Sequence, residues 1–193
     1  MWLWGVFQGL MVSPSSDTGA LSLRSNDFEL FGLAETFDLD LDALDLRWKA
    51  LLKQVHPDQH ATQSSADKKL AMQWSVRINE AYQRLKNPIQ RAAYLCQLNG
   101  FEIQAHQNTS MPADFLVQQM QWRETLDDAE TTDDLSLLHE KVLHEKKLLL
   151  QQCQETMDEH SEWGRAVELV RALMFIEKFE QDLDRHFARL DID

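Results

Sequence analysis

The tripeptide His56-Pro57-Asp58 is the clearest candidate for a chemical role in this chain of 193 residues. A histidine beside an aspartate could act as a general base oriented by a carboxylate. The sequence nearby offers no activated serine or cysteine, metal-ligand partner or oxyanion loop, so catalysis is not favoured. Because the residue before a proline is driven out of the helical region, we expect the tripeptide at a loop tip. On its own, His56 could equally be a turn-capping residue.

The other histidines and the two cysteines do not form a recognisable metal site. His139 and His144 are five residues apart, which differs from the i, i+4 spacing that places two ligands on one helical face. Cys96 and Cys153 are far apart in the sequence and lack a C-x-x-C motif. The sequence also lacks a G-x-x-x-x-G-K-[ST] loop for nucleotide phosphates. We therefore predict no metal, no cofactor and no enzyme activity.

Two predicted amphipathic helices surround the tripeptide. The apolar stripe of the first consists of Leu41, Leu44, Trp48, Leu51 and Val55. The stripe of the second consists of Leu70, Trp74, Ile78, Ala81 and Leu85. Asp40 is the predicted N-cap of the first helix, and Ser65 or Asp67 starts the second. The stripes can pack antiparallel, which would place His56-Pro57-Asp58 at the tip of a helical hairpin.

Short helical segments flank this hairpin, and three longer helices follow. Phe28 to Leu33 forms a turn that Gly32 helps to close, and Pro88 begins a short helix that Asn99-Gly100 ends. The longer helices are predicted at about 112–129, 133–157 and 161–190, with short polar turns between them. Such lengths with short turns predict an antiparallel three-helix bundle.

The predicted fold class is all-α, because six glycines, four prolines and no alternating run of Val, Ile and Thr leave little material for sheets. The predicted parts are an extension at 1–26, a hairpin domain at 27–98, a linker at 99–111 and the bundle at 112–193. The extension begins with an apolar run that superficially suggests a signal peptide or membrane anchor. This apolar run has no Lys or Arg before it, is interrupted by two glycines and is too short to span a bilayer. We therefore interpret it as a poorly ordered extension.

The first bundle helix has two apolar faces, although one suffices for a core. At about 100° per residue, one face carries Phe115, Trp122, Leu126 and Ala129. The nearly opposite face carries Leu116, Val117, Met120, Glu124 and Asp128. A face that begins apolar and ends acidic is typical of a protein-binding patch with a charged rim. In the last predicted helix, Phe175 also lies off the core stripe. The alternative to a protein-binding patch is that this second face and Phe175 pack against the first domain or the linker.

The formal net charge of −13 excludes some classes of partner. Nucleic-acid affinity rests largely on Lys and Arg contacts to phosphates, so a nucleic-acid partner is not indicated. The excess acid is concentrated in residues 98–193, which hold 21 acidic and nine basic side chains. We therefore expect protein partners with basic patches and no membrane association. The cysteine pattern favours a reducing, cytoplasmic location.

Over residues 27–97 the sequence resembles a J domain, the module shared by co-chaperones of DnaK-type ATPases. Besides His56-Pro57-Asp58, the matching residues are Ile78-Asn79-Glu80-Ala81-Tyr82-Gln83-Arg84-Leu85, Pro88, Arg91 and Tyr94. The resemblance implies that the tripeptide and the polar face before it dock on the ATP-bound chaperone and accelerate hydrolysis. That face would carry Arg47, Lys49 and Lys53. Taken alone, the two lysines could simply form a solvated face, and Gln59 stands where many J domains have Lys.

A J domain followed by an acidic helical bundle is similar to the HscB family of co-chaperones. The resemblance implies that the bundle binds the iron-sulfur scaffold protein IscU and that the J domain presents it to HscA, a specialised ATPase chaperone. The scaffold-binding positions it implies are Leu116, Val117, Met120, Glu124, Asp128 and Phe175. Gln121 stands where the family pattern has an acid. A J-domain co-chaperone for a different client is the alternative.

Overall fold

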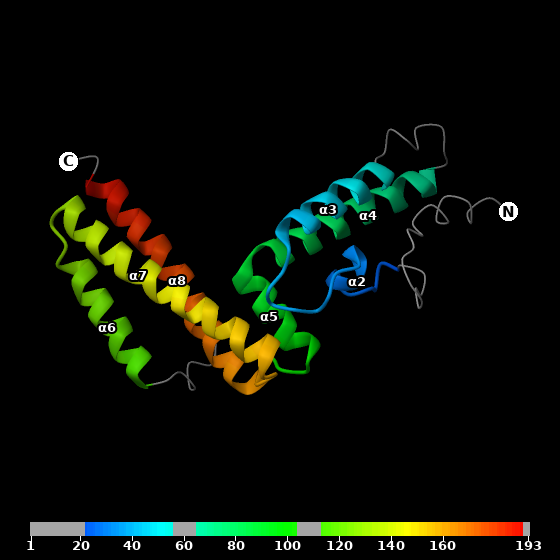
Figure 1. Cartoon of the computed structure of the whole chain (residues 1–193). Coiled ribbons are helices and arrows are strands. Elements are labelled where there is room, and N and C mark those ends of the chain that lie inside the picture. Colours follow the sequence, from blue (N-terminus) through cyan, green and yellow to red (C-terminus); the bar gives the residue numbers. More distant parts are fainter. Residues whose placement is uncertain (1–21, 56–64, 104–112, 191–193) are drawn as a thin grey trace. The chain divides into compact units, whose positions relative to one another are not determined.

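The computed structural model describes residues 22–55, 65–103 and 113–190. Every regular element within these ranges is a helix (Figure 1). In chain order they are α2 (Asp27–Phe31), α3 (Leu41–Val55), α4 (Ser65–Lys86), α5 (Pro88–Leu98), α6 (Ala113–Asp127), α7 (Thr132–Gln154), the π-helix η3 (Glu155–Glu159) and α8 (Trp163–Leu190). The all-α prediction is therefore confirmed. None of the helices in these ranges is long and apolar enough to cross a membrane.

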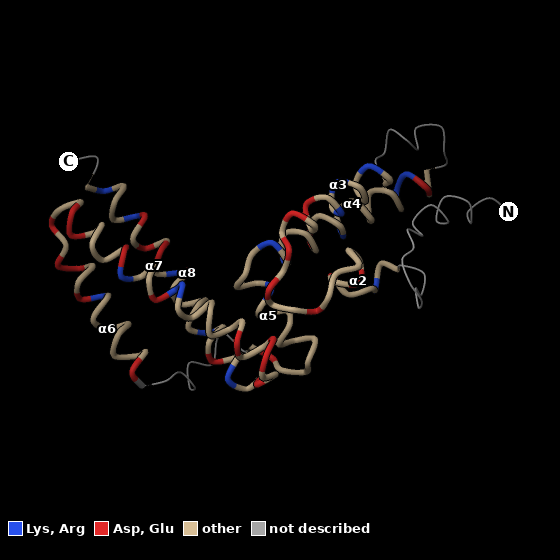
Figure 2. Tube along the Cα trace, viewed as in Figure 1, with Lys and Arg blue, Asp and Glu red and all other residues tan. Residues whose placement is uncertain are grey.

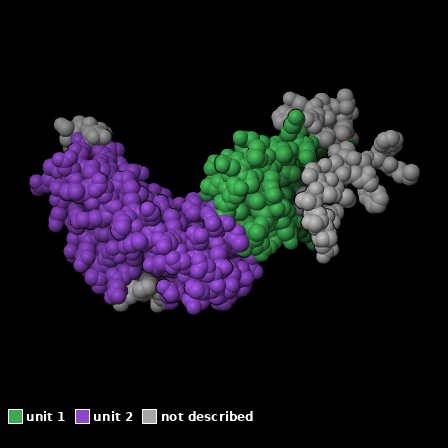
Figure 3. Space-filling model, viewed as in Figure 1, with its two compact units in different colours: residues 1–35, 39–86 green, residues 36–38, 87–193 purple. Residues whose placement is uncertain are grey.

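The chain divides into two compact units (Figure 3). Unit 1 comprises residues 1–35 and 39–86, and unit 2 comprises residues 36–38 and 87–193. This division groups α5 with the bundle because α5 packs along α8. It differs from the sequence-based boundary at residue 98, and the domain bounds 27–98 and 112–193 stay predictions.

In unit 1, α3 and α4 pack against each other as the predicted hairpin. The predicted stripe of α4 supplies four buried residues, namely Trp74, Ile78, Ala81 and Leu85. Trp48 of α3 stacks on Tyr82 of α4, with ring centroids 4.3 Å apart. The prediction for Leu41 is wrong: it is the first residue of α3 and is 44% exposed. Leu44, almost one turn later, is the first α3 side chain that reaches the core.

The short helix α2 is tied to α4 by a buried ion pair. Asp27 is fully buried, and its carboxylate oxygens lie 2.7 Å from Nη1 of Arg77 and 2.8 Å from Nη1 of Arg84. The side chain of Asn26 caps the helix by accepting a hydrogen bond from the backbone N–H of Glu29. Gly32 ends α2 with a φ of 60°, a conformation that favours glycine, so its predicted closing role is confirmed.

In unit 2, α6, α7 and α8 form the predicted three-helix bundle (Figure 1). The predicted core face of α6 is confirmed, since Phe115, Trp122 and Leu126 are buried. Trp122 stacks on Phe179 of α8, with ring centroids 5.7 Å apart. The helix predicted to reach about Met157 consists of α7 continued by η3.

A three-residue segment from the loop between α2 and α3 also belongs to unit 2. Phe37 is buried there, and the N–H groups of Phe37 and Asp38 donate to the carboxylate oxygens of Asp158 at 2.7 and 2.8 Å. Nε of the buried Arg91 donates to the Phe37 carbonyl at 2.8 Å. Burial lowers the pKa of Arg91, and the carboxylates of Asp38 and Asp158 oppose that shift. The segment 36–38 is thus held by α5 and η3.

Candidate partner-binding surfaces

The hairpin of unit 1 carries the first candidate surface. His56, Pro57 and Asp58 lie outside the described residues, so their arrangement stays a prediction. The described helix α3 ends at Val55, and α4 begins at Ser65, one of the two predicted start points. Asp40 accepts a hydrogen bond from the N–H of Ala43 at 2.9 Å, as expected of an N-cap. The predicted N-cap of the first helix and one of the two predicted starts of the second are therefore confirmed.

The three basic side chains assigned to the polar face of α3 have different surroundings. Arg47 donates from Nη1 to the backbone carbonyls of Phe31 and Gly32, so its guanidinium caps the end of α2. Lys49 and Lys53 are exposed, and neither forms an ion pair with another described residue. Lys49 and Lys53 are thus accessible to a partner, whereas the guanidinium of Arg47 is engaged within unit 1; the docking role of all three residues stays a prediction.

The exposed side of α6 carries the second candidate surface. Leu116, Val117 and Met120 are 41%, 54% and 63% exposed. Glu124 and Asp128 are exposed one and two turns further along the same side. The structure therefore brings these five residues together as an apolar patch with an acidic end, which we call the α6 patch. Asp and Glu also recur along the other bundle helices (Figure 2).

Phe175 of α8 stands beside this helix and is half-buried. Its ring meets Phe115 edge to face at 5.9 Å and stacks on Phe179 at 6.1 Å. The guanidinium of Arg123, on α6, lies 5.7 Å from the centre of the Phe175 ring. Phe175 therefore helps to join α6 to α8, and only part of its side chain is available to a partner.

The titratable groups of unit 2 do not form a reactive or metal-binding centre in the part of the chain that the structure describes. No group of three or more His, Cys, Asp or Glu is placed there to hold a metal ion. His144 is exposed, and His139 lies edge-on to Phe187. Burial raises the pKa of the Cys96 thiol to about 11 and that of Cys153 to about 12, so neither is a ready nucleophile.

An open groove of about 570 Å³ runs between α6 and α7. Its walls include the polar side chains of Gln121, Thr125, Lys141 and His144 and the exposed apolar side chain of Leu137. Gln121 is the position at which the resemblance to the HscB family had implied an acid. The groove borders the α6 patch through Gln121 and holds no candidate catalytic constellation.

Two contributors to these surfaces were missed by the sequence reasoning. Leu46 is 69% exposed on α3, the largest exposure of any large apolar side chain in the described ranges. Its position off the apolar stripe of Leu44 and Trp48 could have indicated from the sequence that it is exposed. Arg123 contacts Phe175 across two helices, and no local sequence pattern indicates such a contact.

Comparison with known proteins gives the class of molecule. Residues 111–184 match the family model described as the HSCB C-terminal oligomerisation domain. The co-chaperone protein HscB homolog of Bordetella petrii is 43% identical over 159 residues, which cover 81% of this chain and 92% of that relative. The homolog of Ralstonia nicotianae is 42% identical over 173 residues, covering 88% of this chain and 98% of the relative.

Solved structures agree with this class. The chaperone HscB from Vibrio cholerae matches with a TM-score of 0.75 and 37% identity, covering 86% of this chain and 99% of that one. The human co-chaperone protein HscB matches with a TM-score of 0.80 over 83% of this chain and 81% of that one; its 24% identity supports the fold alone. The class is that of helical co-chaperones with a J domain and a C-terminal helical bundle. Within it, the chain belongs to the HscB co-chaperone family.

Proposed function

We propose that this protein carries an IscU-type iron-sulfur scaffold on its bundle and delivers it to an HscA-type ATPase chaperone. The observation that carries the proposal is the α6 patch, an exposed apolar surface with an acidic end in a member of the HscB family. The J domain of unit 1 would stimulate ATP hydrolysis by the chaperone. The iron-sulfur cluster is the cargo of the scaffold and is not a resident cofactor of this chain.

The α6 patch is suited to a reversible complex. Burial of Leu116, Val117 and Met120 in the interface would stabilise the complex by roughly 1.5 to 3 kcal/mol per side chain, before the costs of association. Those costs leave a moderate affinity, on the order of micromolar. Glu124 and Asp128 would meet basic residues of the scaffold and orient it. A carrier that must release its cargo needs an affinity in this range.

The chaperone side of the proposal involves unit 1. His56-Pro57-Asp58 would contact the ATP-bound chaperone together with Lys49 and Lys53 of α3. The exposed lysines would attract an acidic surface and raise the rate of encounter. In this scheme the chain itself is not an enzyme: it needs no metal or cofactor, binds neither nucleic acid nor membrane, and works in the cytoplasm.

A chaperone ATPase assay tests both halves together. The purified protein should lack ATPase activity, stimulate the cognate DnaK-type chaperone, and stimulate it further when an IscU-type scaffold is added. The variant His56→Gln should remove the stimulation while its circular dichroism spectrum stays unchanged. Unchanged stimulation by this variant would contradict the proposed role of the tripeptide.

A second assay separates this function from that of a J-domain co-chaperone for a different client. In a pull-down with the scaffold, the variant Leu116→Ala combined with Met120→Ala should lose binding. The matched control is Leu148→Ala on α7, because Leu148 is also exposed but lies outside the α6 patch. Wild-type protein that stimulates the chaperone but retains no scaffold would favour the different client.

A further inference from the structure

Leu46 lies on the outward face of α3 and has no role in the core of unit 1. Its side chain is 69% exposed, whereas Leu44 and Val55 of the same helix are buried. At about 100° per residue, Leu46 shares its face with Lys49, Ala50 and Lys53. All four side chains are exposed, and that of Ala50 is too small to cover a neighbour. The face therefore consists of one large apolar side chain beside two lysines.

We propose that Leu46 is an apolar anchor by which α3 binds the ATPase domain of the DnaK-type chaperone, an inference that rests on the proposed function. The occupant of this face would be an acidic surface with an apolar depression. Lys49 and Lys53 would pair with the carboxylates, and Leu46 would fill the depression. Protein interfaces combine an apolar centre with a polar rim, and Leu46 between two lysines would supply such a centre.

The surroundings of Arg47 sharpen this assignment. Its guanidinium is bound to the carbonyls at the end of α2, on a different side of α3 from Leu46. The docking face therefore excludes Arg47 and retains only two of the three basic residues first assigned to it, Lys49 and Lys53. It runs along Leu46, Lys49, Ala50 and Lys53, a spacing of three, one and three residues that follows one side of the helix.

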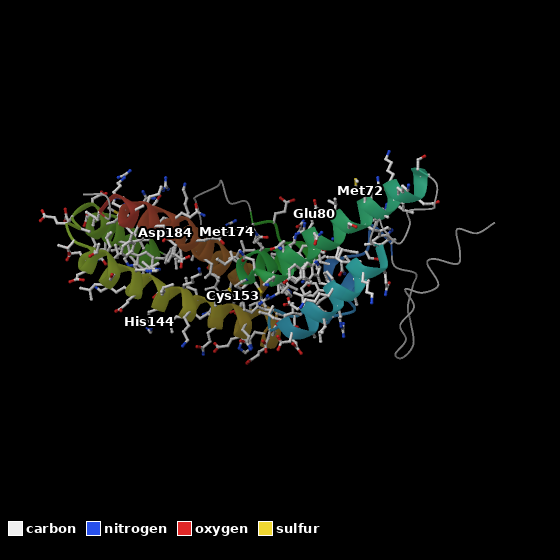
Figure 4. The ribbon with its side chains drawn as sticks, turned by 90° about the horizontal axis from the view of Figure 1, so that it is seen from above. Met72, Glu80, His144, Cys153, Met174 and Asp184 are labelled. Carbon is white, nitrogen blue, oxygen red and sulfur yellow. The ribbon has the colours of Figure 1, made fainter. Side chains whose placement is uncertain are left out.

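Met72 supplies a matched control in the same unit. It is 64% exposed on the outer side of α4 (Figure 4), and Val76 one turn later is also exposed. Leu46→Gln and Met72→Gln remove similar apolar surface from exposed helix positions. Gln has nearly the helix propensity of Leu and Met, so both variants should fold.

The experiment measures stimulation of the cognate DnaK-type ATPase over a range of concentrations of the full-length protein. Leu46→Gln should raise the half-maximal concentration about tenfold or more, which corresponds to losing one buried leucine. Maximal stimulation at saturation should stay near the wild-type value, because an anchor changes affinity and leaves the trigger intact. Leu46→Met should retain wild-type behaviour, and Met72→Gln should change the half-maximal concentration less than twofold.

Ionic strength distinguishes the anchor from the lysines. The loss caused by Leu46→Gln should persist at high salt, whereas the loss caused by Lys53→Gln should shrink as salt screens the charge. Equal effects of Leu46→Gln and Met72→Gln would overturn the inference, and so would a drop in maximal stimulation without a change in half-maximal concentration. Absence of any stimulation by the wild-type protein would instead overturn the proposed function itself.

Discussion

Arg47 and Lys49 are two residues apart on α3, yet only Arg47 is built into the structure of unit 1. Its contacts are the carbonyls of Phe31 and Gly32, and a Cβ added at Gly32 would approach Arg47 Nη1 to 3.3 Å. Arg47→Ala should lower the free energy of unfolding by about 1 to 2 kcal/mol, because charge-assisted hydrogen bonds are lost. Urea denaturation measures this, and Lys49→Ala, the control, should stay within about 0.5 kcal/mol of the wild type. Equal stability of the two variants would show that Arg47 is an ordinary surface residue.

Asp27 is the other residue on which unit 1 depends electrostatically. Its fully buried carboxylate bridges Arg77 and Arg84 of α4. Asp27→Ala should lower the free energy of unfolding by about 3 kcal/mol, the lower part of the range for breaking a buried pair. The lower part applies because Arg77 and Arg84 are partly exposed and can turn to water.

The measurement for Asp27 is again urea denaturation, with Asp42→Ala as the matched control on the exposed first turn of α3. A change of less than 1 kcal/mol for Asp27→Ala would mean that packing of Phe28 and Leu30 alone holds α2 in place.

The two thiols of unit 2 should be chemically inert in the folded protein. Burial raises their pKa to about 11 for Cys96 and about 12 for Cys153, and the Cys96 thiolate adds to the shift of Cys153. At pH 7 a pKa of 11 leaves about one thiol in ten thousand as the reactive thiolate. Labelling with a chromogenic disulfide should therefore be at least about a hundredfold slower than in urea. Rapid labelling of the native protein at pH 7 would contradict this burial.

At the scale of helices, the sequence predicted the elements well where a local residue ends or begins them. Asn87 caps α5 beside Pro88, and Thr131 caps α7 in a capping box with Asp134. The hydroxyl of Thr131 lowers the pKa of Asp134 by donating to its carboxylate. Such signals lie within a few residues of one another, which is why a single sequence shows them.

The parts that could not be predicted depend on contacts between distant residues. The exposure of Leu41 depends on where α3 begins to meet α4, and the half-burial of Phe175 depends on Phe115 in another helix. The two faces of α6 and the one that enters the core were predictable from helical periodicity, but the contact of Phe115 with Phe175 was not. The tripeptide was readable as a motif, and its geometry lies outside the described residues.

The short element η3 holds the segment 36–38 through Asp158, and amide hydrogen exchange can measure this contribution. Both N–H groups bound by Asp158 should be protected from exchange with solvent. Asp158→Ala should speed amide hydrogen exchange at Phe37 and Asp38 about tenfold or more, because each charge-assisted bond contributes roughly 1.5 kcal/mol. Glu159→Ala, one residue away and also exposed, should leave these amides unchanged. Equal exchange in both variants would show that Phe37 is held by Arg91 and packing alone.

At the scale of the molecule, the two candidate surfaces lie in different compact units, so their functions should be separable. Met120 belongs to unit 2 and Leu46 to unit 1. Met120→Gln should weaken scaffold binding about tenfold or more and leave scaffold-free stimulation of the chaperone unchanged. Leu46→Gln should leave scaffold binding unchanged and raise the concentration needed for half-maximal stimulation of the chaperone. Calorimetric titration with the scaffold and the ATPase assay measure the two effects, and a variant that loses both while remaining folded would contradict the separation.

The segment 36–38 also bears on how such a protein could be recombined. The polypeptide passes from one unit to the other three times, after Glu35, after Asp38 and after Lys86. A single genetic crossover at residue 86 would therefore transfer Phe37 without Arg91 and Asp158, and leave both residues behind without their partner. A J domain exchanged in this way would carry an exposed aromatic ring into its new host. Successful shuffling of this unit requires either replacement of Phe37 by a polar residue or joint inheritance of α5 and η3.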